Sequence, residues 1–337
     1  TAGIEFNQDK LEDNMWGYHR TVDQKVNIGS AFFQNEWKNE HWGFLIGGRL
    51  DKHNLIDHVI FSPRANLRYN PTENINLRFS YSSGFRAPQA FDEDLHVENV
   101  GGNVAMVELA DNLKEERSQS LSASADIYHR FGAFQVNFLV EGFYTKLSDV
   151  FALTDGEVVD GILTRTRYNA PGARVMGLTL EGKMAYLTKF QLQAGVTLQQ
   201  SHYSEPHVWN PDAPAVKKMM RTPNTYGYFT ATYTPIKPLS IALSGTYTGS
   251  MLVPHEPVPG FLEKPITVNT KDFFDIGLKA AYDFKLYKSM NLQVNAGVQN
   301  IFNAYQNDFD KGADRDSGYI YGPSLPRSFF AGVKISY

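Results

Sequence analysis

The 337-residue chain carries a formal net charge of −4 and contains no cysteine. This charge argues against a general nucleic-acid binder, which usually presents a basic face. The absence of thiols excludes a disulfide framework, a cysteine zinc site and a cysteine nucleophile. Aromatic residues make up 13% of the chain, yet no apolar run approaches the roughly 18 residues that a membrane-spanning helix needs.

Apolar and polar residues alternate along most of the chain, and this period predicts β-strands. In the segment 271–284, Phe274, Ile276 and Leu278 share one face, while Asp275 and Lys279 share the other. Successive strands that are joined by short turns are expected to pair antiparallel. We expect about 14 of them, many long enough to cross a membrane. Their centres are 1–12, 25–38, 41–52, 59–70, 74–85, 117–130, 133–154, 162–187, 190–204, 224–234, 238–250, 270–286, 289–302 and 325–337.

The connections between these strands alternate in length. The short ones are Asn39–Glu40, Pro71–Glu73, Phe131–Gly132, Thr188–Lys189, Pro235–Lys237 and Tyr287–Lys288. The long, polar ones include Arg86–Glu116, Glu205–Pro223, Met251–Asn269 and Asn303–Ser324. Short turns at one end and long loops at the other are typical of the periplasmic and extracellular ends of an outer-membrane barrel.

Aromatic side chains gather beside the short turns, as Trp37, Trp42 and Tyr69 illustrate. Tyrosine and tryptophan favour the membrane–water boundary because an apolar ring carries a polar tip. We therefore predict an all-β fold, an antiparallel transmembrane β-barrel in one domain. The competing interpretation is a soluble β-sandwich, whose strands are usually shorter and whose loops have no reason to alternate in length.

Gly84 to Pro88 reads GFRAP, and Phe85, Arg86, Ala87 and Pro88 carry this motif. It resembles a box of TonB-dependent outer-membrane receptors, in which a strand ends and a long extracellular loop opens. Residues 111–118 resemble the box NPNLKPERS through Asn112 and Leu113, although Asp111 and Glu115 replace its prolines. Residues 297–303 resemble the NLFN element of the penultimate strand, and the chain ends on the aromatic Tyr337.

This resemblance implies a 22-stranded barrel with an amino-terminal plug. Residues 1–337 are then expected to be a partial barrel, without the plug and without the first strands. The implied location is the outer membrane. The implied partners are membrane lipid, TonB through the missing plug, the barrel-assembly machinery through Tyr337, and a surface lipoprotein. No nucleic acid is expected.

The first long loop carries candidate ligand contacts in Asp92, Glu93, Asp94 and His96. In haem receptors that resemble this pattern, a histidine between the two boxes is an axial ligand, which histidine suits. The competing interpretation is a solvated acidic loop, whose charge repels haem propionates. His207 and Trp209 are further candidates, because exposed aromatics can line a binding mouth; they can equally pack within their loop.

A second candidate site is the acidic loop 307–318. Asp308, Asp310, Asp314 and Asp316 suggest oxygen ligands for calcium, the one cofactor considered. An EF-hand is excluded, because Tyr319 stands where that motif needs a bidentate glutamate. Lys311 and Arg315 offer the alternative of neutralising the acids within the loop.

The chain lacks the nucleophile elbow, the zinc-protease helix and the phosphate-binding glycine loop. We therefore expect a transporter rather than an enzyme. The predicted function is energised uptake of a bulky, scarce nutrient: a ferric siderophore, cobalamin or haem. The alternative is a passive porin or an adhesion-type barrel complete in itself.

Overall fold

The protein is described by a computed structural model that covers residues 1–337 apart from positions 96, 101, 102 and 288. Fourteen strands of nine residues or more dominate this part of the chain, as the alternation predicts. They are β1 (Ala2–Met15), β2 (Arg20–Lys38), β3 (Trp42–His53), β4 (Ile60–Thr72), β5 (Ile75–Arg86), β8 (Glu116–Phe131), β9 (Phe134–Val159), β10 (Ile162–Tyr186), β11 (Phe190–His207), β13 (Thr225–Ile236), β14 (Leu239–Thr248), β17 (Phe273–Tyr287), β18 (Met290–Gln299) and β19 (Ser328–Ser336).

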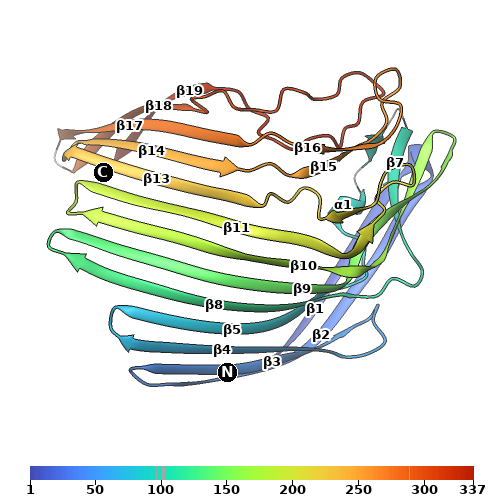
Figure 1. Cartoon of the computed structure of the whole chain (residues 1–337), viewed down its shortest axis with the longest axis horizontal. Coiled ribbons are helices and arrows are strands. Elements are labelled where there is room, and N and C mark those ends of the chain that lie inside the picture. The colour runs from blue at the N-terminus through green and yellow to red at the C-terminus, as the bar shows by residue number, and fades with distance from the viewer. Residues whose placement is uncertain (96, 101–102, 288) are drawn as a thin grey trace.

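Each long strand pairs antiparallel with the next long strand, from β1–β2 to β18–β19. Figure 1 shows the result as a curved wall, with tight turns at one end and long loops gathered at the other. Antiparallel pairing forces alternate connections to opposite ends. The predicted short turns and long loops therefore lie at opposite ends of one wall.

The long loops contain short elements that the sequence pattern did not predict. They are η1 (Trp16–Tyr18), α1 (Asp92–Leu95), β6 (Glu98–Val100), β7 (Asn103–Leu109), β12 (Val216–Lys218), β15 (Leu252–His255) and β16 (Ile266–Asn269). β7 runs parallel to β10, with Val104 opposite Ile162. Among the described residues, no helix is long and apolar enough to cross a membrane.

The strand registers sort the side chains onto two faces. Leu243 lies opposite Leu278 on β17, while Ser244 lies opposite Gly277. Successive side chains of a strand point to opposite faces. The predicted lipid-facing residues therefore share one face, here called the outer face: Ile241, Leu243, Phe274, Ile276, Leu278, Leu292 and Val294. Ser244, Asp275, Lys279 and Asn295 share the inner face.

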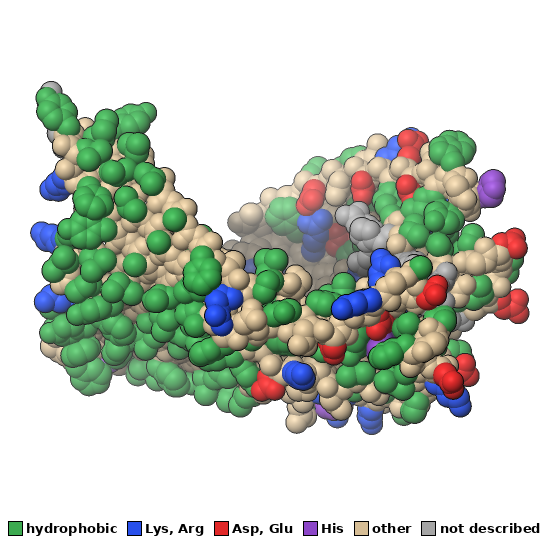
Figure 2. All heavy atoms as spheres, turned by 90° about the horizontal axis from the view of Figure 1, so that it is seen from above, with side chains coloured by type: hydrophobic (Ala, Val, Ile, Leu, Met, Phe, Trp, Pro, Cys, Tyr) green, Lys and Arg blue, Asp and Glu red, His purple; other side chains and the backbone are tan. Residues whose placement is uncertain are grey.

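Figure 2 shows apolar side chains covering the turn-end half of the wall, with charged side chains gathered at the loop end. Aromatic rings pair beside the short turns, where the sequence predicts aromatic side chains at the membrane–water boundary. The Trp42 and Tyr69 rings stack with centroids 4.2 Å apart, and those of Phe134 and Tyr186 lie 4.6 Å apart. Such pairs add about 0.5–1.5 kcal/mol beyond their buried area.

Candidate functional site

The loop between β5 and β8 folds against the inner face of the wall. The Ala90 amide donates to Gln24 Oε1 at 2.7 Å, and Gln24 Nε2 donates back to the Ala90 carbonyl at 3.2 Å. Arg20 Nη2 donates to the carbonyls of Asp94 and Val107, at 2.8 and 2.7 Å. Both anchors come from β2, so this strand holds the loop against the inner face of the wall.

Asp94 of this loop and Arg167 of β10 form a buried ion pair. The guanidinium of Arg167 on β10 meets both carboxylate oxygens of Asp94, at 2.7 and 2.9 Å. Asp94 is only 1% exposed, and it also accepts the Phe91 amide at 2.7 Å. Removing one partner of such a pair strands a buried charge and costs about 3–5 kcal/mol. The pair therefore locks α1 onto the wall.

The residues of this loop that were predicted to contact a ligand differ in their surroundings. Asp94 is committed to Arg167, which makes its carboxylate a loop anchor. Asp92 and Glu93 lie in α1, with their side chains outside what the structure describes. His96 lies outside the described residues altogether. Ligand contact by Asp92, Glu93 and His96 stays a prediction.

The motif residues that open this loop are packed rather than presented to a ligand. Phe85 and Ala87 pack with Ile56 and Ile60, and Pro88 is buried beside them in sequence. The Arg86 guanidinium lies 4.0 Å from the centroid of the Phe91 ring, at cation–π distance. These residues therefore shape the start of the loop.

The second motif leads the chain back into the wall. The Leu113 amide donates to the Ala110 carbonyl at 3.0 Å, while Asn112 is exposed. Glu115, which replaces the family proline, accepts Arg117 Nη2 at 2.7 Å and contacts His58 Nε2 at 3.0 Å. Burial raises the pKa of Glu115, but hydrogen bonds and the charge of Arg117 outweigh it and lower the pKa below its usual value. This cluster joins loop 54–59 to the start of β8.

A second group of loops packs together around β15. Val253 is fully buried in a cluster with Met251 and Tyr319. The His255 ring stacks on the Tyr319 ring with centroids 3.8 Å apart and planes 9° apart. His255 Nε2 lies 2.9 Å from Asp310 Oδ2. The loops after β14 and after β18 therefore form one packed unit at the mouth.

Glu256 ties this unit to the rest of the wall. Its carboxylate meets Arg165 of β10 at 3.1 Å and accepts Asn210 Nδ2 at 2.8 Å. Its amide donates to Asp316 Oδ2 at 3.0 Å. Three loops thus converge on one buried glutamate. Neither Arg165 nor Glu256 belongs to a local motif, so no pattern in the sequence indicated that they would meet.

His207 and Trp209 lie where the chain leaves β11. The His207 ring is half-buried, 4.8 Å from the Tyr203 ring. Trp209 is 8% exposed, and its Nε1 has no hydrogen-bond partner among the described residues. An unpaired buried donor costs about 1–3 kcal/mol. Both side chains pack within their loop, and the indole Nε1 is buried without a partner among the described residues. Ligand contact by His207 and Trp209 stays a prediction.

The four aspartates predicted for calcium do not converge. Asp308 accepts the Tyr321 hydroxyl at 2.7 Å, Asp310 contacts His255, and Asp316 accepts the Gly318 amide at 2.8 Å. Asp314 is exposed. In the described part of the chain, no group of three or more histidine or acidic side chains is placed to hold a metal. Calcium binding stays a prediction, and the residues present do not fit it well.

Comparison with known proteins agrees with the wall and its loops. A family model described as the β-barrel of TonB-dependent receptor-like proteins matches residues 2–301. The chain therefore belongs to the TonB-dependent receptor β-barrel family, a family of outer-membrane proteins. No curated protein matches the chain in sequence.

Solved structures with a similar fold include siderophore receptors. The siderophore receptor PirA of Acinetobacter baumannii matches with TM-score 0.70 and 16% identity, over 98% of this chain and 51% of that one. A variant of the ferric enterobactin receptor PfeA of Pseudomonas aeruginosa matches with TM-score 0.66 and 18% identity, over 98% and 50%. The ferric-catecholate import receptor Fiu of Escherichia coli K12 matches with TM-score 0.65 and 16% identity, over 94% and 45%.

The chain thus spans about half the length of these receptors, and identities this low show the fold alone. That the chain is a partial barrel without its plug stays a prediction. Tyr337 is 98% exposed and lies one residue beyond β19, and its role as an assembly signal also stays a prediction.

Proposed function

We propose that the chain forms wall and mouth of a receptor for energised uptake of a ferric siderophore across the outer membrane. One observation carries the proposal: the long loops are fixed to the inner face of the wall by buried ion pairs to β10. Asp94 holds Arg167, and Glu256 holds Arg165, two positions apart on that strand. A rigid, preorganised mouth suits capture of a scarce ligand, because it reduces the entropy lost on binding.

The ligand class is supported by family membership and by the similar receptors. Those that carry siderophore or catecholate names share the fold of this chain. No ligand contact is assigned to Trp209 or Arg86, because the Trp209 indole is buried and the Arg86 guanidinium already packs on the Phe91 ring. Haem and cobalamin are the alternative substrates. Coupling to TonB is part of the same proposal.

The test is uptake by cells that express the protein as their sole receptor of this class. We expect accumulation of iron supplied as a ferric catecholate, and we expect a proton-motive-force uncoupler to abolish it. Accumulation that is insensitive to the uncoupler would indicate a passive pore and overturn energised transport. A surface lipoprotein partner is tested in the same cells by crosslinking from the loops.

A binding assay separates the ligands. Purified protein is titrated with a ferric catecholate, cobalamin and haem, and tryptophan fluorescence is followed in the unaltered protein and in Trp209→Phe. We expect the ferric catecholate to bind most tightly. Haem binding that shifts its absorption spectrum, and loses that shift in His96→Ala, would replace the siderophore proposal with haem uptake.

A further inference from the structure

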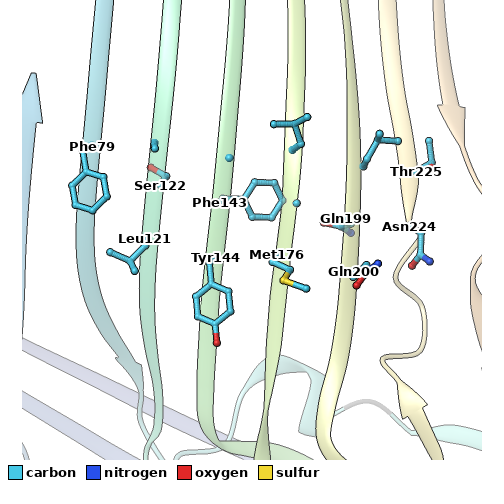
Figure 3. Close-up of a pocket in the computed structure, with 15 residues that line it drawn as sticks. Phe79, Leu121, Ser122, Phe143, Tyr144, Met176, Gln199, Gln200, Asn224 and Thr225 are labelled. Atoms are coloured by element: carbon cyan, nitrogen blue, oxygen red, sulfur yellow. The ribbon is translucent and has the colours of Figure 1, made fainter. Parts of the chain in front are cut away.

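Three arginines lie close together on β4 and β5 and are here called the arginine triad: Arg64, Arg68 and Arg78. Arg68 lies directly opposite Arg78, and Arg64 is four residues from Arg68 on the same strand. Successive side chains of a strand point to opposite faces, so the triad lies on the face opposite that of Phe79. The strand registers place Phe79 on the outer face, where it lines a hollow with Leu121 (Figure 3). The triad therefore lies on the inner face.

The triad has no counter-charge on its own strands. Neither β4 nor β5 contains an aspartate or a glutamate. None of the three arginines forms an ion pair among the described residues, and Arg68 Nε is buried there without a hydrogen-bond partner. Arg78 Nε donates to a neutral group, Asn76 Oδ1, at 2.9 Å. Like charges directly opposite each other destabilise a sheet, and an anion bound between Arg68 and Arg78 removes that cost.

The acids on the two flanking strands, β3 and β8, are already engaged. On β3, Asp51 accepts Arg49 Nε at 2.7 Å. On β8, Asp126 accepts a tyrosine hydroxyl at 2.9 Å, and Glu116 accepts the Phe151 amide at 2.8 Å. The charge of the triad is therefore not offset by the strands beside it.

A polar hollow of about 690 Å³ adjoins Arg68 and Arg78 on their loop side. Asn66 Nδ2 donates to Ser80 Oγ within it, at 2.6 Å. Hydroxyl and carboxamide groups can donate to anionic oxygens beside the guanidinium groups. The lining includes the ion pair of Arg49 with Glu5 and five inner-face residues of β4 and β5: Ser62, Arg64, Asn66, Ser80 and Ser82.

Arg68 and Arg78 lie well below the mouth, toward the short turns. Arg78 is eight residues from Arg86, where β5 ends and the first long loop opens. At about 3.3 Å per residue, this is about 26 Å along the strand. A ligand held among the loops reaches these two arginines only by moving along the wall. The triad is therefore separate from the loop anchors at Asp94 and Glu256.

We propose that the arginine triad and its hollow form a second binding station, which holds an anionic metal chelate on the inner face between the mouth and the short turns. The inference rests on the proposed uptake function and specifies the ligand class for it. The class is a multiply anionic chelate with catecholate or carboxylate oxygens, because guanidinium groups form charge-assisted hydrogen bonds with such oxygens. A neutral hydroxamate chelate gains little from the same station.

The test places a reporter at the station in the purified protein. The chain contains no cysteine, so Ser82→Cys, opposite Arg64, gives a single site for an environment-sensitive fluorophore. The probe is a gallium(III) catecholate, which has the charge of the ferric complex but does not absorb the emitted light. We expect a saturable change of emission that weakens as salt is raised. We expect Arg68→Gln/Arg78→Gln to lower the affinity measured at this label by about ten-fold or more.

The matched control is Lys10→Gln/Lys25→Gln, because these lysines also face each other on neighbouring strands but lie on the outer face. We expect that variant to bind the probe like the unaltered protein. Arg68→Lys/Arg78→Lys keeps both charges and should retain most of the affinity. Equal affinity in the unaltered protein and the glutamine variant would overturn the proposal. So would an equal response to a neutral gallium(III) hydroxamate, because it would show that charge is not recognised.

The label also separates this station from the uptake function. Binding at the label in a protein that shows no energised uptake would overturn the uptake function and leave the station in place. Energised uptake of the ferric catecholate without any response at the label would overturn the station alone. Circular dichroism checks the fold of each variant. If the double glutamine variant does not fold, Arg78→Gln alone, at an exposed position, provides the same comparison.

Discussion

The Asp94 carboxylate and the Arg167 guanidinium meet through two contacts of 2.7 and 2.9 Å across 73 residues of sequence. Both side chains are almost fully buried, so the pair is inaccessible to solvent and to salt. It joins a four-residue helix to the inner face of a wall strand. The loop that holds the predicted ligand contacts is thereby positioned by contacts from β10 and β2, which lie far from it in the sequence.

Breaking this pair from one side should free the loop. We expect Arg167→Met to reduce the free energy that holds this loop against the wall by about 3–5 kcal/mol, because Asp94 is left buried without its cation. The double variant Asp94→Asn/Arg167→Met should cost less, since no buried charge remains. The measurement is the rate of limited proteolysis within residues 87–115. Lys114→Ala, at an exposed position, is the control. Equal cleavage of the single and double variants would contradict the ion-pair account.

The two faces of the wall should respond oppositely to charge. We expect Leu243→Lys, on the outer face, to destabilise the barrel by about 2–4 kcal/mol at mid-depth. Ser244→Lys, one residue along and on the inner face, should change the stability far less. The measurement is the free energy of unfolding in lipid vesicles by urea titration. Comparable losses for the two variants would mean that the outer face is not in lipid.

The two ends of the wall should differ in their accessibility to protease added outside the cell. The loops 87–115, 208–224, 249–272 and 300–327 share one end of the wall, as Figure 1 shows. Protease added to intact cells should cut within them and spare Pro71–Glu73 and Pro235–Lys237 at the other end. Disrupted cells, in which both ends are accessible, provide the control. Cleavage at the short turns of intact cells would reverse the orientation.

The sequence predicted the wall far better than the mouth, for a physical reason. Alternation in segments such as Phe273–Tyr287 reports burial against lipid directly, and the registers place those side chains on one face. The contacts of the mouth, by contrast, join residues far apart in the chain. Glu256 contacts Arg165 although the two are 91 residues apart in the sequence, and no local pattern predicts such a pair. Pro254 interrupts β15, so that strand had no visible period.

The cluster of His58, Glu115 and Arg117 should loosen in acid. The pKa of Glu115 is lowered in the folded protein, from an ordinary value of 4.5. Its contribution is therefore fully present above about pH 4.5 and is lost as the pH falls through the folded-state value. We expect hydrogen exchange in residues 54–59 to accelerate below pH 4.5. Glu115→Gln should exchange rapidly at all pH values, and retained acid sensitivity in that variant would assign the effect to another group.

The tyrosines of the last long loop should make it stable to alkali. Burial, followed by the charge of Asp308, raises the pKa of Tyr319 to about 12, and burial with the Asp308 hydrogen bond raises the pKa of Tyr321 as well. A raised folded-state pKa means that the contribution is complete below about pH 10, the ordinary value, and is lost as the pH rises through the folded-state value. Both hydroxyls donate to Asp308, at 3.4 Å from Tyr319 and 2.7 Å from Tyr321, so ionisation would place like charges together.

Difference absorbance of tyrosinate between the unaltered protein and Tyr319→Phe isolates this one group. We expect it to ionise near pH 12, and we expect Asp308→Asn to bring its ionisation closer to pH 10, because the neighbouring charge is gone. Tyr305→Phe, at a position without a resolved hydroxyl partner among the described residues, provides the comparison. If Tyr319 ionised near pH 10 in the unaltered protein, the packed unit around β15 would be open to water. The loop could then not hold His255 against the Tyr319 ring, and the rigid mouth on which the uptake proposal rests would be lost.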